Sequence, residues 1–357
     1  MKWSFKLVRV AGIDVYIHAT LIILLIWLGL SYWAVEGTLG AALNGVSFIL
    51  TLFTCVVLHE FGHALTAKRY GIRTQHITLF PIGGLAAMER MPDVPKHEIA
   101  VALAGPAVNL IIAILLWFWL TVTNTMISAD ELTLTGGPFA QRLMLFNIIL
   151  VVFNLIPAFP MDGGRVLRAV LALRMNHNRA TQLAAKVGQG FALWLGLMGL
   201  MFNPFLMFIA LFVWIGAASE AAAEEMKSTL LGISAGQAML TDFNVLSSHD
   251  RLDRAIQLTL AGSQKDFPVL DGEAIVGVLT QNDLLRGLHE HGAQASVGSW
   301  MQTGLQYADK DEPLDEVLER LQSDKCRLFA VIEAGHLAGI VNMDNVIELI
   351  SIQKALH

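Results

Sequence analysis

The segment VVLHEFGHALTAKRYG, Val56 to Gly71, places two histidines and a glutamate in a run that otherwise resembles a membrane helix. Ionisable side chains are rare inside lipid and cost several kcal/mol there unless they hold something. His59 and His63 are four residues apart, so on a helix they share one face and can bind one metal ion. This short stretch therefore predicts both a membrane helix and a metal site.

Glu60 follows the first histidine directly, which places it beside the ion rather than on it. A glutamate in that position can take a proton from a metal-bound water molecule. A satisfied polar cluster between helices is the alternative interpretation, and the His-Glu-x-x-His spacing disfavours it. Catalytic zinc usually has three protein ligands and one open position. A third ligand is therefore expected from another part of the chain.

The composition divides the chain into two parts. Of 357 residues, 55% are hydrophobic and only 15% charged, which is unusual for a soluble protein. Up to Ser219 there are 14 Lys/Arg and 9 Asp/Glu, whereas from Glu220 onward there are 10 and 21. The sequence predicts a membrane part followed by an acidic soluble part. Acidic charge argues against nucleic-acid binding, and Cys55 and Cys326, in different halves, imply no disulfide framework.

Six apolar runs can cross a bilayer, for which about 20 residues are needed. They cover approximately residues 15–35, 42–66, 99–122, 139–157, 188–201 and 204–218. The fifth run is short and is extended by the residues before it. The last two runs meet at Asn203-Pro204, which predicts a tight helical hairpin. We expect a polytopic α-helical membrane protein with about six transmembrane helices.

Loop charges predict the orientation, because cytoplasmic loops carry extra Lys and Arg. One side of the bilayer would hold most of the basic loop residues, namely Lys2, Lys6, Arg9, Lys68, Arg69, Arg73, Arg90, Lys96, Arg165, Arg168, Arg174 and Arg179. The other side would hold Glu36, Asp130 and Glu131. The pattern predicts a multi-pass protein of the cell membrane with a cytoplasmic N-terminus and a cytoplasmic soluble part.

Residues 71–91 separate the second and third runs. They contain many β-branched residues and end in Pro81 and Gly83-Gly84, which predicts one or two short strands at the membrane surface. We expect residues 72–79 to pair with an extended polypeptide segment by edge addition.

The third ligand is expected from the sequence FNLIPAFPMDGGR at the end of the fourth run. Pro157 and Pro160 cannot continue a regular helix, so the chain unwinds there. Asp162 then lies at the membrane edge beside two glycines that allow close backbone approach. Arg165 follows Asp162, and Lys68 follows His63 by five residues. Both halves of the predicted site are therefore expected at similar depth near the cytoplasm.

Three motifs resemble those of the site-2 protease family of intramembrane metalloproteases. They are HEFGH at 59–63, AGPAVN at 104–109 and NLIPAFPMDGG at 154–164, in matching order across residues 12–218. The resemblance implies that His59, His63 and Asp162 are the ligands of one zinc ion per chain. It also implies that Glu60 is the catalytic base and that the substrate is itself a transmembrane helix in the lipid bilayer.

Other polar residues give weaker signals. Asn154 either donates to the scissile carbonyl or oxyanion, or ties the fourth helix to the second or third. Asn147, and Asn109 with Gly105, are interpreted as close helix packing. Cys55 lies one turn before His59, and we interpret it as a small apolar filler, because a fourth ligand would close the site to water.

The acidic part contains an internal repeat with an offset of 62 residues and no gap. Leu252 aligns with Leu314 and Gly277 with Gly339. Each repeat predicts the order helix, strand, turn, strand, helix. Residues 220–235 read as a helical linker into this region.

The repeat resembles a tandem pair of CBS domains, at 236–292 and 297–349, following a membrane-embedded protease domain at 1–219. Many such pairs bind adenine nucleotides through a Gly-x-x-Thr-x-x-Asp signature, which Gly277, Thr280 and Asp283 match. In the second repeat Asn342 and Asn345 replace Thr and Asp. The alternatives are that Thr280 and Asp283 only cap a helix, and that the module is structural or holds a homodimer together.

Together these patterns predict an intramembrane zinc metalloendopeptidase that hydrolyses peptide bonds of transmembrane proteins and carries a cytoplasmic regulatory or dimerisation module. A CBS-gated membrane transporter is one alternative, and a non-catalytic membrane scaffold is another. A transporter would spread polar residues along several helices. A scaffold would have no need of the complete set of ligands and base found here.

Overall fold

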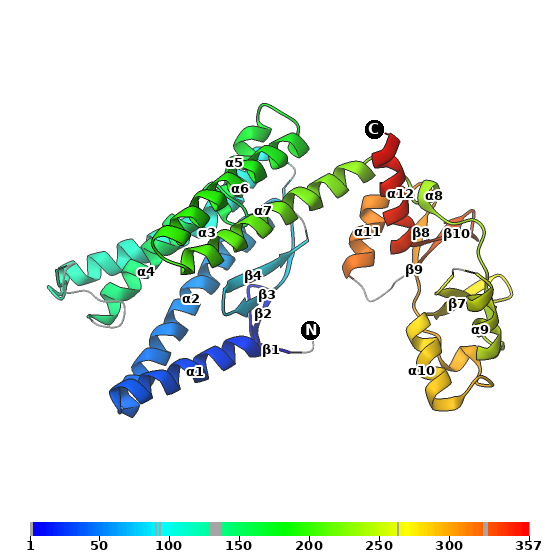
Figure 1. Ribbon diagram of the computed structural model, residues 1–357, viewed down its shortest axis with the longest axis horizontal. Coiled ribbons are helices and arrows are strands. Elements are labelled where there is room, and N and C mark those ends of the chain that lie inside the picture. Colours follow the sequence, from blue (N-terminus) through cyan, green and yellow to red (C-terminus); the bar gives the residue numbers. More distant parts are fainter. Residues whose placement is uncertain are drawn as a thin grey trace. The chain divides into compact units, whose positions relative to one another are not determined.

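The computed structural model describes residues 3–89, 91–92, 94–128, 137–262, 264–323 and 328–356. The chain forms two compact units, Met1–Ala222 and Ala223–His357 (Figure 1). Lys2, Arg90, Asp130, Glu131 and Cys326, which enter the predictions above, lie outside the described residues.

Seven helices are described in the first unit or begin in it. They are α1 (Ala19–Glu36), α2 (Leu39–Arg69), α3 (Pro95–Val122), α4 (Phe139–Asn154), α5 (Asp162–Ala172), α6 (His177–Met201) and α7 (Phe205–Leu230). Five of them, α1, α2, α3, α6 and α7, are long and apolar enough to cross a membrane. The multi-pass architecture is confirmed.

The helix α4 differs from its predicted length. It is apolar but has 16 residues, ending at Asn154 rather than near Pro157. At 1.5 Å per residue it is about 24 Å long, less than the roughly 30 Å hydrocarbon core. Pro157, which has no N–H to donate, lies just beyond its last turn. Five long apolar helices and this shorter one therefore correspond to the six transmembrane helices that the sequence predicts.

The start of the first predicted helix is wrong. Residues 15–18 belong to strand β2 (Ile13–His18), which pairs antiparallel with β1 (Ser4–Val10). Ile13 and Val15 are buried and lie on the same face, which is the period of a half-buried strand. His18 caps α1, because its Nδ1 accepts a hydrogen bond from the backbone N–H of Thr20.

The prediction of one or two short strands after α2 is confirmed. β3 (Thr74–Phe80) and β4 (Gly83–Met88) complete a four-stranded sheet of order β1-β2-β3-β4. The prediction that residues 72–79 accept an added strand is wrong. β3 is bonded to β2 on one side and to β4 on the other, so both of its edges are occupied. β4 is the terminal strand of this sheet.

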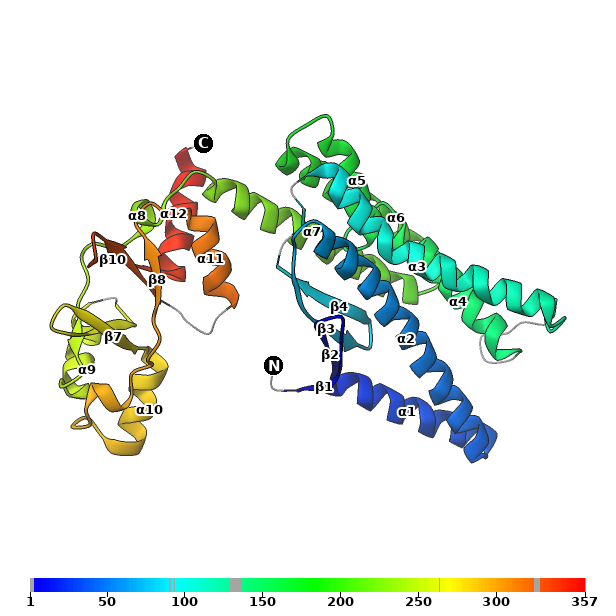
Figure 2. The ribbon, with the colours of Figure 1, turned by 180° about the vertical axis from the view of Figure 1, so that it is seen from behind.

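Helix α3 is central to the first unit. It packs against α2, α4 and α5, and α5 in turn packs against α6 (Figures 1 and 2). The turn between α6 and α7 is tight, as predicted, and Asn203 Oδ1 accepts a hydrogen bond from Phe205 N. α7 continues to Leu230, so most of the predicted helical linker is part of that helix.

The second unit contains the two repeats. The first has α9 (Leu252–Ala261), β6 (Phe267–Asp271), β7 (Ala274–Leu279) and α10 (Gln281–His291), and the second has α11 (Leu314–Ser323), β9 (Leu328–Glu333), β10 (His336–Asn342) and α12 (Met343–Leu356). The shorter elements are α8 (Ala235–Ala238), β5 (Leu246–Ser247), the 3-10 turn η2 (Val297–Ser299) and β8 (Gln306–Asp309). Each repeat has a three-stranded sheet, of order β5-β6-β7 and β10-β9-β8. The predicted element order is confirmed.

Two isolated antiparallel β-bridges connect the repeats. Leu240, near the start of the first repeat, pairs with Ile340 of β10, and Gln302, near the start of the second, pairs with Val278 of β7. These two bridges are related by the same 62-residue offset as the repeat itself. A shared apolar cluster containing Val278, Leu328 and Ile340 is buried between the repeats. The pair therefore folds as one module.

Candidate metal centre

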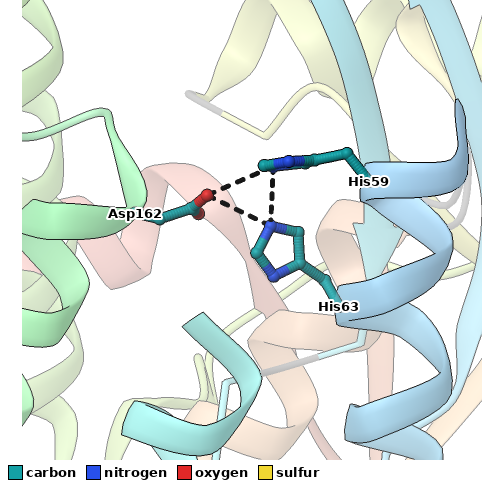
Figure 3. Close-up of side chains that lie close together, drawn as sticks. All are labelled: His59, His63 and Asp162. Atoms are coloured by element: carbon teal, nitrogen blue, oxygen red, sulfur yellow. Dashed lines mark hydrogen bonds and ion pairs between the residues drawn. The ribbon is translucent and has the colours of Figure 1, made fainter. Parts of the chain in front are cut away.

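Two imidazoles on α2 form one side of the centre. His59 and His63 are 6% and 5% exposed, and their Nε2 atoms lie 3.0 Å apart. The rings meet nearly edge to face, with a 4.7 Å centroid separation. Figure 3 shows both rings turned toward the same point beside the helix. The one-turn spacing on a helix produces this convergence, as the sequence predicted.

Asp162, the first residue of α5, forms the other side. Its Oδ2 lies 3.2 Å from His59 Nε2 and 3.1 Å from His63 Nε2, and the residue is 8% exposed (Figure 3). The three residues form one group whose candidate ligand atoms all lie within 4.8 Å of one another. A carboxylate 99 positions away from His63 is thus brought to the histidines by the tertiary fold.

The glycines after Asp162 allow the turn that aims it. A Cβ on Gly163 would collide with the carbonyl oxygens of Leu155 and Ile156. A Cβ on Gly164 would lie 2.6 Å from the backbone nitrogen of Phe159. The first turn of α5 therefore packs directly on the segment between α4 and α5, the close approach expected of these glycines.

The backbone of α3 orients His63, a contact that the sequence analysis did not identify. His63 Nδ1 lies 2.7 Å from the carbonyl oxygen of Val101. A carbonyl can only accept, so Nδ1 carries the hydrogen and the lone pair of Nε2 is free for a metal. Side-chain patterns cannot reveal this contact, because its acceptor belongs to the main chain.

Gly105 on α3 leaves the space in which the imidazoles meet. A Cβ there would collide with His63 Nε2 and lie 2.6 Å from His59 Nε2. From the sequence, this glycine is expected to allow close helix packing. The structure adds a different reason, since any side chain at this position would occupy the space of the two Nε2 atoms.

These residues fit a zinc ion. Bonds of about 2.0–2.2 Å to nitrogen and oxygen place the ligand atoms of a tetrahedral site about 3.3–3.5 Å apart. The observed separations of 3.0, 3.1 and 3.2 Å are within a few tenths of an ångström of that value. The Nε2 lone pair of His63 faces a carboxylate oxygen, and a cation between them removes that repulsion.

Glu60 lies next to the histidines but is not one of the converging ligands. It is half-buried and packs against strand β4, where a Cβ on Gly84 would lie 2.7 Å from Glu60 Cγ and 3.1 Å from Oε1. The terminal strand of the sheet therefore approaches this carboxylate, and the missing side chain of Gly84 leaves room for it. No pattern in the sequence indicates this contact.

Asn154 and Asn147, the two asparagines singled out on α4, each donate a hydrogen bond along their own helix. Asn154 Nδ2 donates to Leu150 O at 3.0 Å, along its own helix rather than to α2 or α3. Asn147 donates to Leu143 O at 2.8 Å and lies 3.6 Å from Cys55 Sγ. Asn147 and Cys55 are both buried. Cys55 packs among apolar neighbours, in agreement with its predicted role as a filler.

Thr280 and Asp283 lie together in the first repeat. Thr280 caps α10, and its Oγ1 accepts a hydrogen bond from Asp283 N, which confirms the predicted cap. The carboxylate of Asp283 also accepts from Gln302 Nε2 at 2.7 Å and from Arg286 Nη2 at 2.6 Å. Burial by itself raises the pKa of Asp283, but hydrogen bonds from the hydroxyl of Thr280, from Arg286 and from Gln302 outweigh it and lower the pKa below its ordinary value.

The second repeat has a simpler version of this arrangement. Asn342 Oδ1 accepts from Asn345 N at 2.9 Å, so an asparagine takes the capping position of Thr280. Asn345 Oδ1 is buried without a hydrogen-bond partner among the described residues. The repeats therefore share the cap but not the buried carboxylate.

Comparison with known families matches both parts of the chain. The sequence profile of Peptidase family M50 matches residues 47–136 and 125–195. The profile of the CBS domain matches residues 235–290 and 297–352.

Individual proteins show the same two similarities. The chain is 32% identical to a zinc metalloprotease of Methanocaldococcus jannaschii over 99% of this chain and 97% of that one. A solved site-2 protease from M. jannaschii is 37% identical and covers 61% of this chain and 95% of its own, with a TM-score of 0.45. The CBS domain of a bacterial CNNM/CorC family Mg²⁺ transporter, solved with ATP, is 23% identical over 36% of this chain and 97% of its own, with a TM-score of 0.33.

Proposed function

Because the chain belongs to Peptidase family M50, as a site-2 type intramembrane zinc metalloprotease with two CBS domains, we propose a role for each polar residue of its metal centre. His59, His63 and Asp162 hold the zinc ion, and Glu60 is the catalytic base. One observation carries this assignment. Three buried ligand atoms from two distant parts of the chain converge beside a glycine whose missing side chain leaves them room.

Zinc held by these residues supplies Lewis acidity, which activates water toward a peptide carbonyl. The chain's own residues do the rest. Val101 O keeps the hydrogen of His63 on Nδ1, so that Nε2 stays a ligand. Glu60 lies one residue from His59, takes the proton of the attacking water and passes it to the leaving amine. Asn154 is proposed, with weaker support, to donate to the oxyanion, which would require its amide to leave Leu150 O.

The substrate is proposed to be a transmembrane helix of another protein. A helix hides its carbonyls in hydrogen bonds four residues apart, so the substrate must unwind before cleavage. The terminal strand β4 can pair with the extended segment by edge addition. It replaces residues 72–79 in that role, because Gly84 of β4 lies against Glu60. A segment bonded to β4 would pass beside the catalytic base.

The chain is a multi-pass membrane protein, and we propose that its N-terminus and CBS module face the cytoplasm of the cell. The basic residues after α2 and in α5 support this orientation. Lys68 lies near the end of α2, five residues after His63, so the metal centre is near the cytoplasmic face and water can reach it.

We propose a regulatory module at 236–292 and 297–349, with an adenine nucleotide as its ligand in the first repeat. Thr280 and Asp283 are the contact residues suggested by the family signature. The buried carboxylate of Asp283, which the second repeat lacks, supports a single site. The competing function is a purely structural or homodimer-forming module. The contacts of Asp283 with Gln302 and Arg286 favour this competing function, because they already occupy the carboxylate.

Replacing Glu60 by Gln tests the catalytic proposal. We expect zinc affinity to stay within about twofold, because Glu60 is outside the ligand group, and cleavage of a transmembrane substrate to fall by roughly 10²–10⁴. Zinc content and cleavage of a reconstituted membrane peptide are measured together. The control is Glu89→Gln, an exposed glutamate just after β4. Full cleavage by Glu60→Gln would remove the proposed base.

Titration of the detergent-solubilised chain with ATP, ADP and AMP tests the regulatory module. We expect saturable binding that is lost in Asp283→Asn and retained in Asn345→Ala, which changes the matched position of the second repeat. If none of the three nucleotides binds saturably, the module is structural or dimer-forming. Measuring the molecular size of the chain over a dilution series then decides between these two functions.

A further inference from the structure

A second group of buried charges lies on the same short helix as Asp162. Arg168 of α5 is 3% exposed, and Glu98 of α3 is fully buried. Arg168 Nε and Nη2 both contact Glu98 Oε1, at 2.7 and 2.6 Å. Its third nitrogen, Nη1, donates to Glu220 Oε1 of α7 at 2.6 Å. One guanidinium therefore joins three helices.

Arg168 also contacts the segment that aims Asp162. Its guanidinium carbon lies 5.3 Å from the ring centroid of Phe159, which is fully buried three residues before Asp162. Gly164 brings the first turn of α5 against the backbone of that same phenylalanine. The aromatic ring, the turn and the guanidinium therefore form one packed unit behind the metal ligand.

The helix on the other side of the ion pair supports the histidines. Glu98, Val101 and Gly105 are spaced by three and four residues, so they share one face of α3. Val101 accepts the hydrogen bond of His63, and Gly105 leaves the space for both imidazoles. The contact between Glu98 and Arg168 thus connects the helix that orients the histidines to the helix that supplies the third ligand.

Stability alone does not explain this arrangement. Removing charges from water is costly, and replacing a buried ion pair by packed apolar residues is often neutral or stabilising. Phe159 already packs in an apolar cluster with Ala184 and Ala217, which such residues could extend. What the ion pairs add is a fixed geometry, because the planar guanidinium holds two carboxylates in defined directions.

We infer that Arg168 is a positioning residue, which sets the distance between Asp162 and the two histidines by fixing α5 to α3 through Glu98 and to α7 through Glu220. This inference rests on the proposed function, because it concerns the same metal centre. Glu220 has the outer position, with its side chain 32% exposed, and its helix continues to Leu230.

Substitution of Arg168 by Lys tests the inference, because an ammonium cannot reproduce the three-nitrogen contact. The control is Arg174→Lys, the same change at an exposed position just after α5. Zinc affinity is measured by competition with a chelator on the purified full-length chain. The visible absorption of Co²⁺ substituted for zinc reports coordination geometry, and the thermal midpoint reports folding.

We expect Arg168→Lys to weaken zinc binding by about tenfold or more, the range found for groups that orient metal ligands, and to change the Co²⁺ spectrum. Arg174→Lys should match the parent in both measurements. A lowered thermal midpoint with unchanged zinc affinity and Co²⁺ spectrum would overturn the inference, because the role would then be structural only. If the parent itself does not bind zinc, the proposed function fails instead.

Glu220→Gln keeps the test decisive if Arg168→Lys does not fold. The outer carboxylate is partly exposed, so its replacement should be tolerated. A smaller fall in zinc affinity with an altered Co²⁺ spectrum supports the inference. Parent values for both measurements would overturn it.

Discussion

The chain buries an aspartate in each of its two units, and the two are bonded in opposite ways. Asp162 faces the Nε2 atoms of two imidazoles. In His63, the carbonyl of Val101 holds the hydrogen on Nδ1, so Nε2 presents a lone pair to Asp162. Asp283 is surrounded by donors from Thr280, Gln302 and Arg286. A buried carboxylate with enough donors is complete, whereas one that faces other acceptors needs a cation. The surroundings of a buried carboxylate, rather than its burial, indicate a metal site.

Replacing each of the two aspartates by asparagine should give the largest difference between the two units. Asp162→Asn should weaken zinc binding by more than about 100-fold, because a ligand is lost rather than an orienting group. Cleavage of a membrane substrate should fall with it. Asp283→Asn, the matched control, should leave zinc content unchanged. Equal zinc content in both variants would contradict the comparison.

Filling the space at the metal centre should have the next largest effect. Gly105→Ala places a methyl group against both imidazoles, so we expect zinc affinity to fall by roughly 10- to 100-fold while α3 remains helical. Gly190→Ala is the matched control, since a Cβ there meets nothing within 4 Å. Zinc competition and circular dichroism measure the two effects, and parent-like zinc binding by Gly105→Ala would show that the space is not needed.

The smallest expected effect concerns the pH dependence of the second unit. The pKa of Asp283 is lowered in the folded state, so its hydrogen bonds stabilise the fold above the ordinary aspartate pKa of about 3.9. This contribution is lost as the pH falls through the lower folded pKa. The free energy of unfolding of residues 223–357, measured with urea, should be lower at about pH 3 than at pH 7. We expect this decrease to be smaller in Asp283→Asn than in the parent, by less than about 1 kcal/mol. An equal loss in both proteins would assign the acid sensitivity to other carboxylates.

Much of the fold was predictable because its signals are local. The apolar runs gave the five long helices to within a few residues, apart from the strand before α1, the start of α6 eleven residues before residue 188 and the continuation of α7 past residue 218. The 62-residue repeat gave the element order of both CBS repeats. Strand β2 was missed because Val15 and Ile17 continue directly into an apolar helix, and hydropathy does not distinguish the two. The free edge of the sheet was misassigned because strand order depends on β1 and β2, which precede α1.

The sequence by itself determined the chemistry that is available at the centre. A helical repeat of 3.6 residues places His59 and His63 on one face, and an apolar environment makes their presence costly unless they bind something. Only the tertiary structure decided how these groups meet. The approach of Asp162, the carbonyl of Val101, the space beside Gly105 and the guanidinium of Arg168 all depend on the packing of α2, α3 and α5. Contacts between segments far apart in the chain, and contacts made by main-chain atoms, leave no periodic signal in the order of residues.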